Sequence, residues 1–193
     1  MNDSDIRQVV LSKLNREYHD DPKTMIIEEL GLCQGDARID IAVVNGSIHG
    51  FEIKSDKDTL RRLNNQIEIY NRSLSFVTLV VGEKHLTAAL KLIPKWWGVI
   101  IANENSDQKP LLRIRRKAKS NLFLDPFAVA QLLWRDEALT ALKRKGLHKG
   151  FANKPRAVLW RRLAEHLPTE ELPSLVRSFF KARENWRSGY KQA

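Results

Sequence analysis

Polar residues with regular spacing in the first third of the chain could form a site for metal-assisted chemistry. Asp40 lies in one alternating apolar segment, Glu52 and Lys54 lie in the next, and Gln66 and Tyr70 follow four residues apart. Because side chains alternate along a strand, Glu52 and Lys54 share one face. Carboxylates hold hard cations such as Mg²⁺, which lower the pKa of bound water and polarise a phosphate, while an ammonium group offsets developing charge. The pattern therefore predicts phosphodiester chemistry.

The turn between the two predicted strands decides whether the two carboxylates meet. The sequence favours a two-residue turn at Asn45-Gly46, which would place Asp40 opposite Phe51. Asp40 and Glu52 would then face opposite sides of the sheet. We therefore expect a three-residue loop over 45–47, or a bulge before Phe51, that shifts the register by one residue.

These residues resemble the RecB-like branch of the PD-(D/E)XK nuclease superfamily, although the proline of that name is absent. The resemblance covers roughly the first hundred residues and also extends to an uncharacterised bacterial family. An acidic residue is expected upstream of the hairpin, at Glu28 or Glu29. These two are adjacent and point to opposite faces, and the resemblance favours Glu29. The motifs that carry the resemblance are Ile39-Asp40, Glu52-Ile53-Lys54 and Gln66-x-x-x-Tyr70.

The resemblance implies an α/β, restriction-endonuclease-like core, in which a mixed β-sheet is flanked by helices, with a helical C-terminal extension. It implies metal-dependent hydrolysis of DNA with Mg²⁺ or Mn²⁺, in repair or in defence. The alternatives are a non-catalytic DNA-binding protein that retains the fold and a nuclease that acts on RNA. The implied catalytic residues are Glu29, Asp40, Glu52, Lys54 and Gln66, and the implied metal ligands are Asp40, Glu52 and the Ile53 carbonyl.

Apolar periodicity places further helices and strands around this segment. A helix is expected over 4–18 with Ser4 as its N-cap, and Ser55 or Asp58 is expected to cap the helix that carries Gln66. Gln66 borders the apolar stripe of that helix, either to orient groups of the site or as an ordinary helix-edge residue. The other expected elements are strands over 24–30, 76–81, 97–102 and 111–117, a helix over 85–92, and helices beyond Pro126.

The composition is that of an ordinary soluble protein, with 42% hydrophobic and 29% charged residues. No apolar run reaches the ~18 residues that a membrane span requires, and the N-terminus lacks a signal-peptide pattern. Cys33 is the single cysteine, so an intrachain disulfide is excluded. The five histidines lack the spacing of zinc ligands. We therefore expect a cytoplasmic protein with no membrane partner.

Positive charge is concentrated in the second half of the chain. Residues 1–109 carry 14 Lys and Arg against 16 Asp and Glu, whereas residues 110–193 carry 19 against 7. Such asymmetry predicts a near-neutral core followed by a region that binds a polyanion. We accordingly divide the chain into a core over 1–117 and a basic helical region over 118–193, with DNA as the expected partner.

The segment 136–167 resembles a SAP-type helix-turn-helix DNA-binding motif. One helix is expected to end near Gly146, a basic turn follows, and Pro155 marks the start of a second helix. The alternative is a basic helical hairpin that packs on the core without binding DNA. The expected nucleic-acid contacts are Tyr70, Lys143, Arg144, Lys145, Lys149, Lys154 and Arg156.

Overall fold

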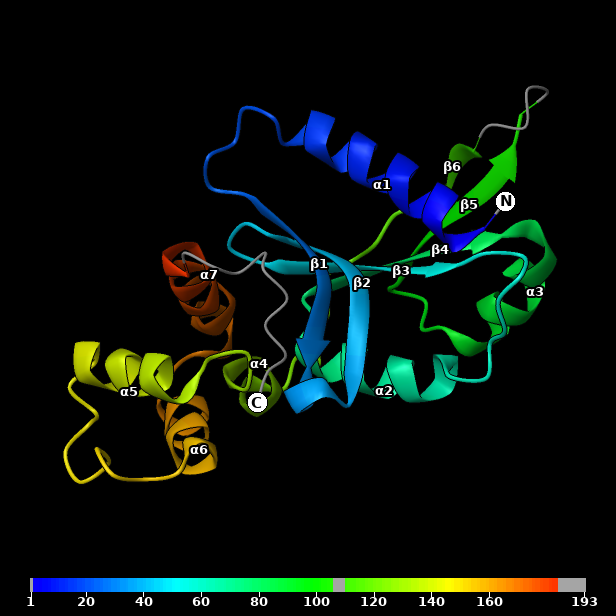
Figure 1. Ribbon diagram of the computed structural model, residues 1–193. Coiled ribbons are helices and arrows are strands. Elements are labelled where there is room, and N and C mark those ends of the chain that lie inside the picture. The colour runs from blue at the N-terminus through cyan, green and yellow to red at the C-terminus, as the bar shows by residue number, and fades with distance from the viewer. Residues whose placement is uncertain (1, 106–109, 184–193) are drawn as a thin grey trace.

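A computed structural model describes residues 2–105 and 110–183 (Figure 1). Six strands form one mixed sheet in chain order, with β3, β4 and β5 parallel and the other neighbours antiparallel. The strands are β1 (Met25–Leu32), β2 (Ala37–Val44), β3 (Ile48–Lys54), β4 (Phe76–Gly82), β5 (Gly98–Glu104) and β6 (Pro110–Arg116). The helices are α1 (Asp3–Glu17), α2 (Leu63–Ser73), α3 (Glu83–Leu92), α4 (Pro126–Ala130), α5 (Arg135–Arg144), α6 (Arg156–His166) and α7 (Leu172–Ala182), with short 3-10 turns η1 (Cys33–Gly35) and η2 (Thr169–Glu171). The predicted α/β class, a mixed sheet flanked by helices with a helical C-terminal region, is confirmed.

Helix α1 covers one face of the sheet (Figure 1). Its N-cap is Asn2 and not the expected Ser4. The Asn2 side chain accepts from the Asp5 N–H at 3.0 Å, and the Asp5 carboxylate accepts from the Asn2 N–H at 2.9 Å, which forms a capping box. The apolar stripe of α1 packs in one cluster with residues of β2 to β5 and with Leu112 of β6, and the stripe consists of Ile6, Val10 and Leu14.

The hairpin between β2 and β3 has the register that the sequence argument requires. Val44 pairs with Ile48 across a three-residue loop, 45–47. The same register places Asp40 across from Glu52, so both carboxylates lie on one face of the sheet. The prediction of a loop longer than two residues is confirmed.

Strand β1 is distorted at Glu29. This residue has a φ of 55°, in the left-handed region that non-glycine residues rarely adopt. Pairing with β2 resumes at Leu30 in the same register, which leaves Glu29 across from Asp40. The distortion costs about 1–3 kcal/mol and requires compensating contacts.

Helix α2 begins later than expected, at Leu63. The two proposed cap residues close a turn ahead of it, in which Asp58 accepts from the N–H and the hydroxyl of Ser55 at 2.7 and 2.6 Å. Helix α2 then covers the face of the sheet opposite α1 (Figure 1). This placement directs Gln66 and Tyr70 toward β3.

The C-terminal helices share a buried cluster with this second face of the sheet. Asn121, which precedes them, donates to the carbonyls of Asn71 and Leu74 at 2.6 and 2.9 Å and fastens the region to α2. The boundary at residue 117 stays a prediction, but hydrophobic burial is continuous across it. Members of the cluster beyond that boundary include Ala128, Val129, Leu132, Leu142, Trp160, Leu163 and Phe180.

The sequence predicted that no segment spans a membrane. Within residues 2–105 and 110–183, no helix is long and apolar enough to cross a bilayer. The cytoplasmic location stays a prediction.

Candidate functional site

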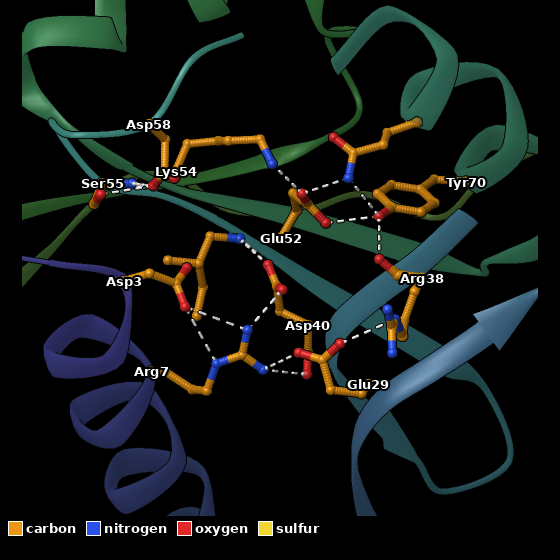
Figure 2. A network of polar contacts seen from close by, with 12 residues as sticks. Asp3, Arg7, Glu29, Arg38, Asp40, Glu52, Lys54, Ser55, Asp58 and Tyr70 are labelled. Atoms are coloured by element: carbon orange, nitrogen blue, oxygen red, sulfur yellow. Dashed lines mark hydrogen bonds and ion pairs between the residues drawn. The ribbon is translucent and has the colours of Figure 1, made fainter. Parts of the chain in front are cut away.

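Three carboxylates stand side by side on three adjacent strands. Glu29 of β1 lies across from Asp40 of β2, which lies across from Glu52 of β3. They line one cleft together with residues of α1, of α2 and Trp134 of the C-terminal region. Figure 2 shows the network of polar contacts that surrounds them.

Arg7 of α1 joins the first two carboxylates. Its guanidinium lies 2.6 Å from a Glu29 oxygen and 2.8 Å from an Asp40 oxygen, and it also donates to the Asp40 carbonyl at 3.2 Å. Arg38 pairs with the second Glu29 oxygen at 3.1 Å. These contacts hold the distorted β1 backbone in place and attach α1 to the sheet by charge as well as by apolar packing.

Arg7 was not among the residues predicted from the motif, although the sequence contains a signal for it. Arg7 lies three residues before Val10 and seven before Leu14, so it shares the apolar stripe of its helix. A charge in that position is costly unless it is paired. An arginine within this apolar stripe therefore implies an acidic partner on the sheet.

Asp40 has an unusual titration. Burial and, after it, the neighbouring Glu52 raise its pKa to about 7, against the lowering effect of the Ile53 N–H and of Arg7. The Ile53 N–H donates to the second Asp40 oxygen at 2.7 Å. Asp40 therefore exchanges its proton near neutral pH, in a position that bridges β2, β3 and α1.

Glu52 is 1% exposed and accepts three side-chain donors. Lys54 and Gln66 donate to one oxygen, the latter at 2.7 Å, and the Tyr70 hydroxyl donates to the other at 2.6 Å. The Tyr70 hydroxyl also lies 2.8 Å from the Arg38 carbonyl oxygen, and burial, followed by Glu52, raises the pKa of Tyr70. Glu52 thus joins β3 to α2 through buried polar contacts.

The structure brings together all the residues that the motif selected in the sheet and α2. Glu29, not Glu28, enters the network, as the resemblance favoured. Ile53 contributes its N–H to Asp40, and Tyr70, expected to contact nucleic acid, is fully buried against Glu52. The other expected nucleic-acid contacts lie in and between α5 and α6, away from this cleft (Figure 1). They are Lys143, Arg144, Lys145, Lys149, Lys154 and Arg156.

The network does not fit a divalent cation as it is arranged. Both oxygens of Glu29, of Asp40 and of Glu52 already accept protein donors. Each oxygen that accepts one donor keeps a second lone pair, but a divalent cation would compete with the cations Arg7 and Lys54 for the same carboxylates. Among the described residues, no three His, Cys, Asp or Glu side chains are grouped to hold a metal. Binding of Mg²⁺ or Mn²⁺ stays a prediction, and no reaction step is derived from it.

The raised pKa of Asp40 predicts a pH-dependent stability. Asp40 has an ordinary pKa of 3.8 when unfolded and about 7 when folded, so the folded protein binds the extra proton between these values. Its contribution to stability is complete below pH 4 and is lost as the pH rises through 7. The free energy of unfolding of the wild type relative to Asp40→Asn should therefore fall by on the order of 2 kcal/mol between pH 4.5 and 7.5.

Urea denaturation of both proteins at each pH measures this difference. The comparison with Asp40→Asn is needed because burial lowers the pKa of His49 to about 4, which makes stability rise over part of the same range. His49 is present in both proteins, so its effect cancels. A difference that is constant with pH would show that Asp40 has an ordinary pKa.

Comparison with known proteins identifies a phage protein family. The family model described as "Bacteriophage P4 protein cII" matches residues 1–190. "Protein cII" of Enterobacteria phage P4 is 29% identical over 158 residues, which cover 82% of this chain and 59% of that protein. The chain thus spans less than two thirds of the length of this relative. No solved structure matches the chain.

These matches correct the family and the activity inferred from the motifs. The matching family model, which spans nearly the whole chain, is not a PD-(D/E)XK nuclease model, so that assignment is wrong. The inferred activity of a Mg²⁺- or Mn²⁺-dependent deoxyribonuclease, hydrolase or endonuclease is overturned with it. In the structure, the motif residues form an internally paired charge network that connects α1, three strands and α2. The chain belongs to the bacteriophage P4 protein cII family.

Proposed function

We propose that the chain binds double-stranded DNA through residues 143–162, here called the basic hairpin. This segment contains eight Lys and Arg residues and no Asp or Glu. Contacts between such cations and phosphates release counterions from DNA, which supplies affinity without reading sequence. The concentration of eight cations, with no acidic residue among them, on one helical hairpin is the observation that carries the proposal.

The backbone of the basic hairpin is held in a defined shape. Helix α5 ends in a Schellman motif, in which Leu147 N–H donates to the Leu142 carbonyl at 2.8 Å and Gly146 N–H donates to the Lys143 carbonyl at 3.1 Å. Gly146 has the positive φ of 72° that this motif requires. Residues 145–155 join this end of α5 to the start of α6.

Apolar residues hold the two helices together and direct the charges outward. Leu142 of α5 and Leu159, Trp160 and Leu163 of α6 are buried in the shared cluster. The Trp160 indole N–H donates to the Leu133 carbonyl at 2.9 Å, which fixes α6 to the segment before α5. The spacing between cations on the two helices is therefore set by packing.

The exposed cations of the basic hairpin differ in their partners, and one of them, Lys145, pairs with Glu171 of η2 at 2.8 Å. Lys143, Lys149 and Lys154 are exposed and form no ion pair with another described residue. Arg156 and Arg161 are exposed but lie over aromatic rings, at 5.4 and 5.6 Å from the ring centres. Such contacts restrict the guanidinium groups to defined orientations. The basic hairpin thus presents both flexible lysine ammonium groups and oriented arginine guanidinium groups. Both kinds of group can bind phosphate.

Salt-dependent binding to a labelled 20-base-pair duplex tests the proposal. If five cations contact phosphates, the logarithm of the association constant should fall with log salt at a slope of about −4.5. Fluorescence anisotropy at several salt concentrations measures it, with a matched RNA duplex in parallel. A slope near zero, or binding of RNA in preference to DNA, would contradict the proposal.

A further inference from the structure

Strand β6 is an open edge of the sheet. It pairs with β5 on one side, and no strand in the described part of the chain pairs with its other side. In Figure 1 it lies at the opposite end of the molecule from α5 and α6. The unpaired N–H and C=O groups of such an edge can accept a further strand.

The edge is strongly basic. Residues 110–124 contain five Lys and Arg and no Asp or Glu. Arg113 and Arg115 are exposed and form no ion pair with another described residue. Arg116 instead turns inward and donates to the carbonyls of Trp97 and Pro94 at 2.7 and 3.2 Å, which fixes the end of the strand. The contacts of Arg116 therefore fix the backbone that carries Arg113 and Arg115.

Exposed apolar side chains accompany these charges. Leu111 is 56% exposed and Ile114 is 52% exposed, which is unusual for an edge strand that must avoid association. Ile114 pairs with Ile100 and Arg113 pairs with Ile101, so Ile114 and Arg113 point to opposite faces of the sheet. Ile114 thus offers apolar contact on one face, whereas Arg113 offers positive charge beside Leu111 on the other face.

We infer that β6 binds an extended acidic segment of a partner protein by strand addition. Main-chain hydrogen bonds would supply affinity, and the alternation between Arg113 and Ile114 would select a segment in which acidic and apolar residues alternate. Pairing of β6 with β6 of a second copy would bring like charges at Arg113 and Arg115 together, which is destabilising. The backbone of nucleic acid offers phosphate acceptors but lacks the regularly alternating donors and acceptors of a β-strand.

Two synthetic peptides test this inference. The first has eight residues that alternate glutamate and valine, and the second replaces each valine with proline. Both carry the same charge, but proline removes N–H donors and prevents strand pairing. Fluorescence anisotropy should show binding of the first peptide and at least tenfold weaker binding of the second. Equal binding of the two peptides by the wild-type protein would overturn strand addition without any variant.

Two variants with equal charge change locate the binding. R113E with R115E should weaken binding of the glutamate–valine peptide at least tenfold and leave duplex DNA binding nearly unchanged. K143E with K149E, in the basic hairpin, should do the reverse. If R113E with R115E instead weakens DNA binding and not peptide binding, the edge belongs to a nucleic-acid surface and the inference fails. The inference does not depend on the proposed function, because peptide binding tests strand addition at β6 and duplex DNA binding tests the basic hairpin.

Discussion

Replacement of Glu52 with alanine is expected to lower the free energy of unfolding by about 3–5 kcal/mol. The carboxylate is 1% exposed and accepts from Lys54, Gln66 and Tyr70. Its removal leaves a lysine whose side chain is 7% exposed without an anion, and leaves two polar donors without an acceptor. Urea denaturation monitored by tryptophan fluorescence measures the loss.

Two controls separate the charge network from a general effect of substitution. Glu28→Ala changes an exposed glutamate on strand β1, and its effect should remain within about 0.5 kcal/mol. Glu52→Leu combined with Lys54→Met replaces the buried pair by apolar groups and should recover part of the stability lost in Glu52→Ala. A loss below about 1 kcal/mol in Glu52→Ala would show that the network does not stabilise the fold.

Substitution of three lysines by glutamine should weaken duplex DNA binding on the order of 10²-fold at 0.1 M salt. Lys143, Lys149 and Lys154 are exposed and form no ion pair with described residues, so their loss leaves the apolar packing of α5 and α6 intact. Three lost phosphate contacts should also make the salt slope shallower by about 2.7. Anisotropy titrations of the variant and the wild type measure both quantities.

An equal change of charge elsewhere provides the matched control. Three exposed lysines lie outside the basic hairpin: Lys13 of α1, Lys57 in the segment before α2, and Lys91 of α3. Their joint substitution by glutamine removes the same three charges and should change the slope by less than about 1. If both triple variants lose the same affinity, binding depends on the net charge of the protein and not on the hairpin.

The sequence predicted most of the architecture because the fold depends on periodic patterns. Alternation over residues 37–54 set the face of each side chain, and the need to bring Asp40 and Glu52 together determined the three-residue loop. The start of α2 was misplaced because Ser55 and Asp58 satisfy each other in a turn, and a local pattern does not distinguish a turn from a helix cap.

The function was predicted wrongly because a motif specifies residue types and not their partners. Asp40, Glu52 and Lys54 lie where the motif places them, but donors already occupy every carboxylate oxygen. The essential partner, Arg7, is 33 residues from Asp40 in the sequence, and only the tertiary fold brings the two together. The same residue types serve a catalytic site or a structural ion network, depending on what fills the space between them.

The distortion at Glu29 limits how many chains can assemble on the sheet. Strand β1 is the edge opposite β6, and its backbone leaves the extended conformation at this residue. Arg177 and Lys181 of α7 also donate to the carbonyls of Lys23 and Pro22, at 3.2 and 2.5 Å, just before β1 begins. Head-to-tail growth requires two edges that both accept strands, and the edge at β1 is interrupted at Glu29. Complexes formed at β6 should therefore have a stoichiometry of one to one and should not extend into filaments.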